Sequence, residues 1–410
     1  MPRRMNTLSF RGGYRFRGFQ GVPTDQIAEI PPGQTAAIPL HVTQSAKVSP
    51  GDQVTVGQII GDTDGSPRRV TISPVSGSVS TVSPDLIEVE CTGDQSWSPV
   101  AGASADWGTL SVDTIEDILL ATGCSGAIAT GLPTRHATAA LAPVEVRRVV
   151  VHDSGAEVYK TSVKALMDGR DAGHLLDGLS ILKKLYPHAE IHLVLGDEAK
   201  AEFQDLASRA VSSDGLSVHT GSAKYPQNNP YVLMGSIFGD RIAADAVNQD
   251  ADKAVVMDLQ ALLQVRDAVV TGKPAIDRVV ALAGPGFTAT QHVRVRVGTP
   301  VQAVIAGYLG EGQSPRLVWN SVMTGEQVGD VSEPVGTGAT ALIAVPQAAP
   351  EFIPFIAVGA RRDSFSSTFL SSIVKLPKTL DDNLHGETRA CIGCGYCEAI
   401  CPAGILPFIL

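Results

Sequence analysis

Residues 145–152, EVRRVVVH, decide the fold, because the three consecutive valines Val149 to Val151 are typical of a strand buried on both faces. A helical pattern follows, and then a second apolar strand at residues 191–195 (IHLVL), a helix at 199–211 and a short strand at 216–219. The helical pattern rests on five leucines that share one face: Leu175, Leu176, Leu179, Leu182 and Leu185. Strands that alternate with helices predict βαβ units and a parallel sheet. We therefore predict a Rossmann-like α/β domain over residues 101–258.

Upstream of this domain the hydrophobic pattern indicates short strands separated by turns. Residues 48–60 (VSPGDQVTVGQII) and 73–79 (SPVSGSV) alternate apolar residues with glycine and proline signals, as half-buried strands do. This arrangement resembles a barrel-sandwich hybrid of the lipoyl type, which we place at residues 39–100. Residues 53–85 contain no lysine that could bear a swinging cofactor, so we predict an unmodified, structural module. Residues 1–38, rich in glycine and proline, are expected to form an extended N-terminal segment.

Downstream, residues 259–345 combine helices and strands in a way that fits a β-grasp module. A helix at 259–270 is stopped by Gly272 and Pro274, and strands are expected at 277–284, 292–297 and 316–319. A further helix is expected at 299–308. The remaining residues, 346–410, are proline-rich, with short helices and a cluster of cysteines.

Composition excludes several classes of protein. The net charge of −10 argues against a nucleic-acid binder, which needs a basic face. No segment offers the roughly 20 apolar residues that cross a bilayer, and the N-terminus lacks the apolar core of a signal peptide. We therefore expect a cytoplasmic protein without a transmembrane helix of its own, which contacts a membrane only through a partner.

Four of the six cysteines lie within 11 residues and carry the strongest chemical signal. Residues 391–402 (CIGCGYCEAICP) match C-x₂-C-x₂-C-x₃-C-P, the spacing of bacterial ferredoxins. Structural zinc normally uses two ligand pairs separated by a longer span. We therefore predict a [4Fe-4S] cluster, with these metal ligands: Cys391, Cys394, Cys397 and Cys401.

The fourth ligand has alternatives, because the last cysteine of such a run holds the other cluster in two-cluster ferredoxins. Cys401 could close the same cluster, or Cys91 or Cys124 could supply the fourth thiolate. A third alternative is that the chain is a shortened form, since residues 405–410 form an apolar tail. By default, lone cysteines such as Cys91 and Cys124 are expected to be small buried hydrophobic residues.

A glycine-rich stretch at residues 123–134 (GCSGAIATGLPT) precedes Arg135 and could cradle a phosphate through its backbone N–H groups. The candidate cofactor-binding residues are Gly123, Gly126, Gly131 and Thr134. The stretch matches neither G-x-G-x-x-G nor the P-loop pattern, so an ordinary turn is the main alternative to a flavin or nucleotide site.

Motifs along most of the chain resemble two related families: the A subunit of the Na⁺-translocating NADH:quinone oxidoreductase and the C subunit of the Rnf electron-transport complex. The pair Gly12-Gly13 and the strand pattern of residues 48–60 look like both. The resemblance to the Rnf protein rests on residues 272–274 (GKP), 277–279 (DRV) and 293–300 (VRVRVGTP), and on the cysteine run. The resemblance to the quinone-reductase protein rests on residues 282–285 (LAGP), 321–325 (SVMTG) and 364–371 (SFSSTFLS).

The chain also departs from the Rnf pattern. The Rnf protein normally has two cluster motifs, and this sequence shows one. Of its flavin loop, G-x-G-G-A-G-F-P-T, only Gly126-Ala127 and residues 132–134 are matched, and the following E-C-E-P-Y segment is replaced by residues 153–159 (DSGAEVY). These departures count against FMN binding and direct NADH oxidation by this chain.

Together these features predict a multidomain α/β protein that works as a peripheral electron-transfer subunit. The resemblance implies a membrane-bound NADH:quinone oxidoreductase of the sodium-transporting type, in which this chain takes the place of the A subunit on the inner face of the cell membrane. The alternatives are a protein like the C subunit of the Rnf complex, and a non-catalytic docking subunit. The expected partners are membrane-embedded and flavin-bearing subunits, with ubiquinone or NADH as possible small-molecule partners.

Overall fold

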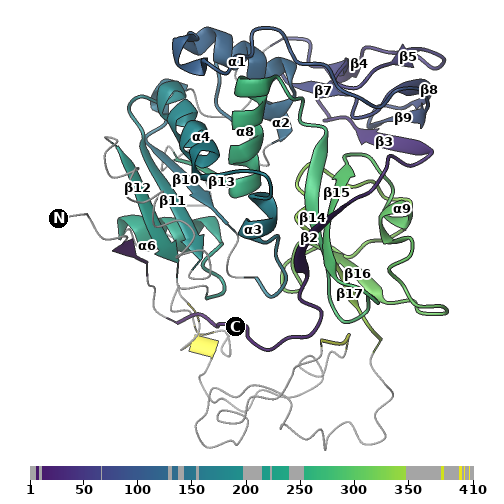
Figure 1. Ribbon diagram of the computed structural model, residues 1–410, viewed down its shortest axis with the longest axis vertical. Helices are drawn as coiled ribbons and strands as arrows, with labels where there is room; N and C mark the ends of the chain where they lie inside the picture. The colour runs from purple at the N-terminus through teal and green to yellow at the C-terminus, as the bar shows by residue number, and fades with distance from the viewer. Residues whose placement is uncertain are drawn as a thin grey trace, which may run out of the picture.

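The structure is a computed structural model. It describes residues 6–8, 12–65, 67–127, 132–136, 143–153, 157–196, 215–221, 224–239, 254–347 and 380–382, together with 397–398, 401 and 406. Within these residues the chain forms a mixed α/β structure with four sheets. Figure 1 shows the parallel sheet with its helices on one side of the view, and the remaining sheets on the other.

The first sheet is parallel and has the strand order β1-β12-β11-β10-β13. Every pairing between neighbours is parallel, which confirms the parallel sheet predicted from the alternating strands and helices. Its strands are β1 (Asn6–Thr7), β10 (Arg148–His152), β11 (Glu190–Gly196), β12 (Leu216–Gly221) and β13 (Ala254–Asp258). The predicted helix at 199–211 lies outside the described residues.

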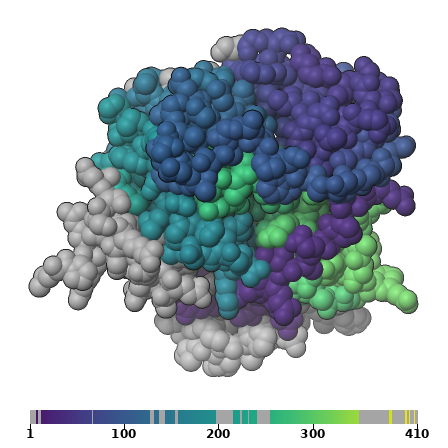
Figure 2. All heavy atoms as spheres, turned by 45° about the horizontal axis from the view of Figure 1, so that its top comes forward, coloured from purple at the N-terminus to yellow at the C-terminus, as the bar shows by residue number. Residues whose placement is uncertain are grey.

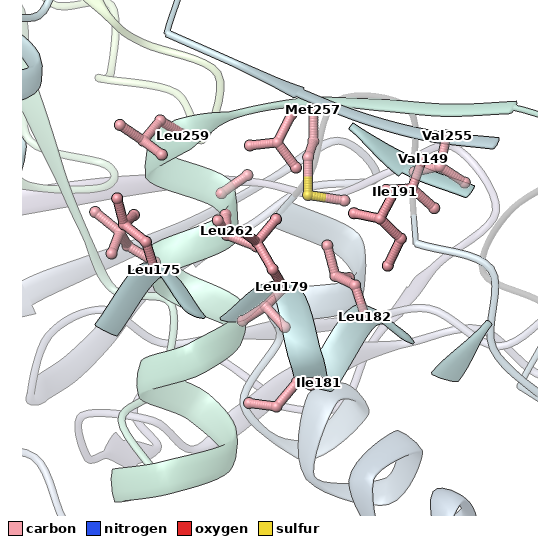
Figure 3. Close-up of a cluster of buried hydrophobic side chains, with 14 of the residues drawn as sticks. Val149, Leu175, Leu179, Ile181, Leu182, Ile191, Val255, Met257, Leu259 and Leu262 are labelled. Atoms are coloured by element: carbon pink, nitrogen blue, oxygen red, sulfur yellow. The ribbon is translucent and has the colours of Figure 1, made fainter. Parts of the chain in front are cut away.

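Helices α1 (Val112–Ala121), α4 (Ala172–Leu185) and α8 (Leu259–Thr271) share one hydrophobic core with this sheet. Figure 3 shows leucines of α4 and α8 meeting side chains from β10, β11 and β13. Leu179, Leu182 and Leu262 are almost fully buried, and each such side chain stabilises the fold by about 1.5–3 kcal/mol. Helix α8 therefore packs with the parallel sheet, although the sequence grouped it with the next module.

Sequence signals fix where these helices begin and end. Asp171 caps α4 in a capping box with His174, and Asp258 accepts the N–H of Ala261 at the start of α8. Gly272 ends α8 with a φ of 70°, a left-handed conformation that glycine adopts without strain. Helix α6 (Pro230–Phe238) contributes to a second apolar cluster with Val150 and Val194, on the other face of the sheet.

The second sheet is mixed, with the order β16-β17-β14-β15-β2. Its members are β2 (Thr24–Glu29), β14 (Asp277–Ala283), β15 (Gln291–Arg296), β16 (Arg316–Trp319) and β17 (Ala341–Val345). The predicted helix at 299–308 is shorter, because α9 (Val301–Ile305) begins after Pro300 and is followed by Gly307 with a φ of 82°. The other short helical segments are η1 (Trp107–Thr109), α2 (Cys124–Ala127), η2 (Pro143–Glu145) and α3 (Val163–Leu166).

The last two sheets are antiparallel and small, with the orders β3-β9-β8-β5 and β4-β6-β7. They enclose their own core, which contains Ile60, Val75, Ile87 and Val89. Their strands are β3 (Thr35–Pro39), β4 (Ser45–Ala46), β5 (Gln53–Val54), β6 (Ile59–Asp62), β7 (Val70–Ile72), β8 (Gly77–Val82) and β9 (Leu86–Cys91). In Figure 2 this purple unit lies against the blue and teal surface of the parallel-sheet region.

The N-terminal segment, expected at residues 1–38, contributes strands to three sheets. Strand β1 joins the parallel sheet, β2 pairs in parallel with β15, and β3 pairs with β9. The segment thus ties the three parts of the molecule together.

Candidate functional site

A cavity of about 180 Å³ lies where loops of the parallel sheet and the mixed sheet meet. After β10, the chain adds β11 and then β12 on one side of that strand. It later returns and adds β13 on the other side of β10. Such a switch point leaves a crevice at the carboxyl ends of the strands, where open α/β sheets bind ligands. Asp153 directly follows β10 and Asp258 ends β13, and both line the cavity.

The cavity wall is polar and rich in carboxylates. The second sheet adds Asn320, Ser321 and Thr324 after β16, and Thr340 before β17. The other lining residues come from the loops after β10 and β12, from the end of α3 and from the start of α8: Glu157, Tyr159, Lys160, Thr161, Leu166, Asn228, Leu259 and Gln260. Asn320 and Thr324 are exposed, so the cavity opens to solvent on their side.

Glu157 joins the two halves of the cavity. Its Oε1 accepts a hydrogen bond from Asn228 Nδ2 at 2.9 Å, and its Oε2 accepts one from Ser321 Oγ at 2.8 Å. Burial raises the pKa of this carboxyl, and the two hydrogen bonds oppose the rise. Both oxygens are therefore fixed in position by neutral donors.

Asp258 is held by the helix that it caps and by a buried arginine. Arg278 Nη2 lies 3.1 Å from Asp258 Oδ2, while the rest of the guanidinium donates to Ala339 O and to Gln264 Oε1. The side-chain amide of Gln260 pairs with both backbone groups of Val279, at the start of β14. These contacts fix the floor of the cavity against the mixed sheet.

Lys160 and Asp153 converge above the end of β11. Gly196 donates its N–H to Asp153 Oδ2 at 2.7 Å. A Cβ atom at Gly196 would lie 3.2 Å from that oxygen and 3.8 Å from Lys160 Nζ. Both side chains thus reach the end of β11.

The predicted glycine-rich loop lies elsewhere. A Cβ atom on Gly123 would meet the side chain of Ile72 on β7 at 3.1 Å, and one on Gly126 would meet Arg69 at 3.5 Å. Both glycines therefore face the antiparallel unit. Gly131 lies outside the described residues. Thr134 is buried, and its hydroxyl oxygen has no hydrogen-bond partner among the residues that the structure describes.

Arg135, the basic residue after this loop, is surrounded by carboxylates of α1. It pairs with Asp113 at 3.0 Å and with Asp117, and its Nε lies 3.7 Å from the buried Glu116. Its backbone N–H also donates to Glu116 at 2.9 Å. These contacts use the guanidinium to anchor the loop to α1.

Of the four predicted cluster ligands, Cys391 and Cys394 lie outside the described residues. Cys397 and Cys401 are half-buried, and the N–H of Cys401 donates to the carbonyl of Cys397 at 3.0 Å. This i to i+4 hydrogen bond places the two cysteines one helical turn apart, on the same side of the backbone. Among the described residues, no group of three metal-binding side chains comes together.

The two remaining cysteines are in different surroundings. Cys124 is fully buried in the core under α1, and desolvation raises its pKa to about 12. Burial also raises the pKa of Cys91, which ends β9. Cys124 is buried, as expected of a lone cysteine, whereas Cys91 is half-buried.

Sequence reasoning missed the cavity residues. Asp153 and Asp258 could have been found, because each follows a predicted buried strand and the carboxyl ends of parallel strands lie at one edge. Glu157, Asn228 and Ser321 carry no local signal, since they come from three separate loops.

Within the described part of the chain, the helices are too short or too polar to cross a bilayer. A family model described as the RnfC barrel sandwich hybrid domain matches residues 8–93, which supports the barrel-sandwich hybrid predicted from the strand pattern. A model described as the NQRA C-terminal domain matches residues 279–330, inside the range predicted as a β-grasp module. Each match overlaps a part of the chain that carried the resemblance.

Curated relatives cover nearly the whole chain. The C subunit of the ion-translocating oxidoreductase complex of Pseudomonas aeruginosa is 25% identical over 93% of this chain and 47% of that protein. The C subunit of the Na⁺-translocating ferredoxin:NAD⁺ oxidoreductase complex of Acetobacterium woodii is 24% identical over 93% of this chain and 83% of that protein. The chain thus spans about half the length of the Pseudomonas relative.

The solved structure of an NAD⁺-reducing [NiFe]-hydrogenase in the H₂-reduced state has 15% identity and a TM-score of 0.44, over 59% of this chain and 49% of that chain. A TM-score this low does not establish a shared fold. The resemblance predicted from the sequence is nevertheless confirmed by the family models and the curated relatives: the chain is similar to the C subunits of ion-translocating oxidoreductase complexes.

Proposed function

We propose that this chain is a peripheral electron-transfer subunit of a membrane-bound redox complex of the Rnf type. The observation that carries the proposal is the run of four cysteines at residues 391–401, in a chain that is similar to the C subunits of such complexes over 93% of its length. The relatives favour this assignment over the A subunit of the quinone reductase. The cysteine run favours it too, since the quinone-reductase protein usually has no cluster there.

The donor set fits an iron–sulfur cluster. Cysteine thiolates are soft ligands that suit iron–sulfur clusters, and the spacing matches a ferredoxin run. Cys397 and Cys401 lie one helical turn apart and are half-buried, so both thiols can serve one metal centre. The cluster, when bound, supplies one-electron transfer, and the chain supplies the thiolates, the partial exclusion of water and the attachment to the complex.

A flavin mononucleotide does not fit the described cavity. Three carboxylates face the cavity with a single lysine, which opposes the binding of a phosphate dianion. The described glycines of the predicted flavin loop, Gly123 and Gly126, pack against the antiparallel unit instead. We therefore propose that other subunits of the complex carry the flavin.

We also propose the arrangement of modules and the location. In this proposal the barrel-sandwich hybrid occupies residues 39–100, a Rossmann-like domain 101–258, a β-grasp module 259–345 and a ferredoxin-like cluster segment 346–410. The protein lies on the inner face of the cell membrane, where it contacts membrane-embedded and flavin-bearing subunits.

The test is spectroscopic and uses the full chain purified without oxygen. Iron and sulfide content, with the electron paramagnetic resonance spectrum of the reduced protein, should report a [4Fe-4S] cluster. Cys394→Ser should lose most of the iron, whereas Cys91→Ser, the matched control outside the run, should keep it. A colourless protein with stoichiometric zinc, or a cluster that the reduced complex does not reduce, would contradict the electron-transfer role.

A further inference from the structure

We propose that residues 12–22 form a docking loop for anionic lipid headgroups, so that this chain touches the membrane surface directly. The sequence alone led us to expect contact with a membrane only through a partner. The direct contact rests on the membrane location proposed above, but it does not depend on the iron–sulfur cluster. Three features support it: the charge of the N-terminal segment, the way the docking loop is held, and the aromatic rings beside its arginines.

The N-terminal segment is the basic part of an acidic protein. Residues 1–24 contain five arginines and no aspartate or glutamate, so their charge is +5. The net charge of the chain is −10, so the remaining residues together carry −15. An anionic membrane therefore repels most of this protein and attracts this segment, by about fivefold in binding for each arginine near the surface. The charge distribution sets which part of the protein faces the lipid.

Hydrogen bonds hold the docking loop at both ends. Tyr14 and Tyr225, which follows β12, exchange two backbone hydrogen bonds of 2.8 and 2.9 Å. Further along the loop, the carbonyl of Gln20 accepts a hydrogen bond of 2.6 Å from the hydroxyl of Tyr159. Between these anchors Arg17 is exposed, and it has no hydrogen-bond or ion-pair partner among the residues that the structure describes. Because the loop is already held in place, less conformational entropy is lost when this guanidinium meets a phosphate group.

Aromatic rings flank this arginine. The ring centroid of Phe16 lies 5.1 Å from that of Tyr14, 5.8 Å from that of Tyr225 and 5.9 Å from that of Phe19. All four rings are half-buried, so part of the aromatic cluster stays at the surface, and Val22 beyond it is 57% exposed. Aromatic and basic side chains together are typical of surfaces that lie at the level of lipid headgroups. This combination favours lipid over an acidic protein, for which the arginines alone would be sufficient.

The experiment measures how much of the full chain sediments with lipid vesicles. Vesicles of one part phosphatidylglycerol to two parts phosphatidylcholine should bind the chain, whereas phosphatidylcholine alone should not. Added salt should weaken the binding, because exposed charges are screened. The triple variant Arg3→Gln, Arg4→Gln and Arg17→Gln should bind about a hundredfold more weakly, at about fivefold for each arginine. Phe19→Ala keeps every charge and should also weaken the binding, with thermal unfolding as the check that each variant is folded.

The matched control is the triple variant Lys47→Gln, Arg68→Gln and Arg147→Gln, which has the same net charge. These exposed cations lie in the antiparallel unit and just before β10, at the opposite edge of the parallel sheet from Tyr225. Such positions are farther from the lipid than a Debye length of about 8 Å, so the control should bind nearly as the wild type does. The iron content of the arginine variant should equal that of the wild type, which separates this proposal from the electron-transfer role.

Four results would overturn the lipid contact: no binding to the anionic vesicles, equal binding to both kinds of vesicle, unchanged binding in the arginine variant, or an equal loss in the control. Unchanged binding in Phe19→Ala would also contradict it, because charge alone would then act and an acidic protein would be the better occupant of the docking loop.

Discussion

The Nε2 of His292 accepts the backbone N–H of Ser162 at 2.9 Å, across the junction between the mixed sheet and the loop that enters α3. On its other side, His292 Nδ1 lies 2.6 Å from the carbonyl oxygen of Thr24 on β2. The carbonyl can only accept, so Nδ1 carries the proton and Nε2 is free to accept from Ser162. Burial lowers the pKa of His292, which keeps the ring in this neutral form.

Replacing His292 with leucine should destabilise the protein by about 2–4 kcal/mol. The change leaves the N–H of Ser162 and the carbonyl of Thr24 without their shared partner, in a place where the imidazole is fully buried. Urea unfolding would measure the loss. His188→Leu, at an exposed turn, is the control and should change the free energy of unfolding by less than about 0.5 kcal/mol. Equal stability of the two variants would show that this junction is not important for the fold.

The pair His192 and His219 should make the stability depend on pH. Their Nδ1 and Nε2 atoms lie 2.8 Å apart in a buried contact, so one ring must donate and the other must accept. Burial lowers the pKa of both rings, and that of His219 falls from 6.5 to about 4. The unfolded chain therefore binds more protons between these values, and the free energy of unfolding should fall as the pH drops from 6.5 to 4, by up to about 3 kcal/mol.

The measurement is urea unfolding at several pH values, for the wild type and for His219→Gln. Glutamine keeps a polar partner for His192 but does not titrate, so the slope between pH 4 and 6.5 should become shallower. His41→Gln is the control, because that side chain is exposed on the antiparallel unit. An unchanged slope in His219→Gln would assign the acid sensitivity to other groups.

Gly77→Ala should disrupt the antiparallel unit. Gly77 begins β8 opposite Cys91, and a Cβ atom there would overlap the backbone carbonyl of Glu90. Backbone cannot move aside as a flexible side chain can, so we expect a loss of about 2 kcal/mol or more in the free energy of unfolding. Gly108→Ala is the control, since no atom lies within 4 Å of its added Cβ. Comparable melting temperatures for both variants would mean that β8 and β9 are not this close in solution.

Arg135→Met should separate an anchoring role from a phosphate-binding role. The change leaves the buried Glu116 without its cation, so the free energy of unfolding should fall by about 1–3 kcal/mol. Burial already raises the pKa of Glu116, and removing the cation should raise it further, so the loss should be larger at pH 7 than at pH 4.

Lys47→Met is the control for Arg135→Met, because it removes an exposed ion pair with Asp64, which is worth at most about 1 kcal/mol. Inorganic phosphate should leave the melting temperatures of the wild type and of Arg135→Met unchanged. If phosphate stabilises the wild type alone, the anion-binding interpretation of this loop is correct and the anchoring interpretation is wrong.

The sequence predicts the elements whose hydrophobic pattern is local. Three valines in β10 and the leucine stripe of α4 were sufficient to predict the parallel sheet and its helical cover, because burial on a regular element leaves a periodic trace. The pairing of β2 with β15 could not be predicted in this way. It joins residues such as Ile27 and His292, and no local pattern records a contact over such a separation.

The cavity illustrates the same limit. Asp153 and Asp258 sit at strand ends and are predictable in principle, whereas the contact of Glu157 with Ser321 joins residues 164 positions apart. The glycine content of residues 123–134, by contrast, predicted a binding loop that the described glycines do not form. Gly123 and Gly126 have the composition of a phosphate loop, but in the structure they allow a close approach to Ile72 and Arg69.

The identity of the fourth cluster ligand is decided by comparing three cysteine variants. Cys401 is one helical turn from Cys397, whereas Cys124 is buried in a separate core with its pKa raised to about 12, so it is poorly suited to serve as a thiolate. We therefore expect Cys401→Ser to lower the iron content and change the spectrum of the reduced protein, while Cys91→Ser and Cys124→Ser retain the wild-type iron content. Iron analysis and electron paramagnetic resonance of protein purified without oxygen make the measurement. If Cys401→Ser keeps its full cluster and one of the other two variants loses it, the ligand comes from outside the run, and the segment must then approach that cysteine in the assembled protein.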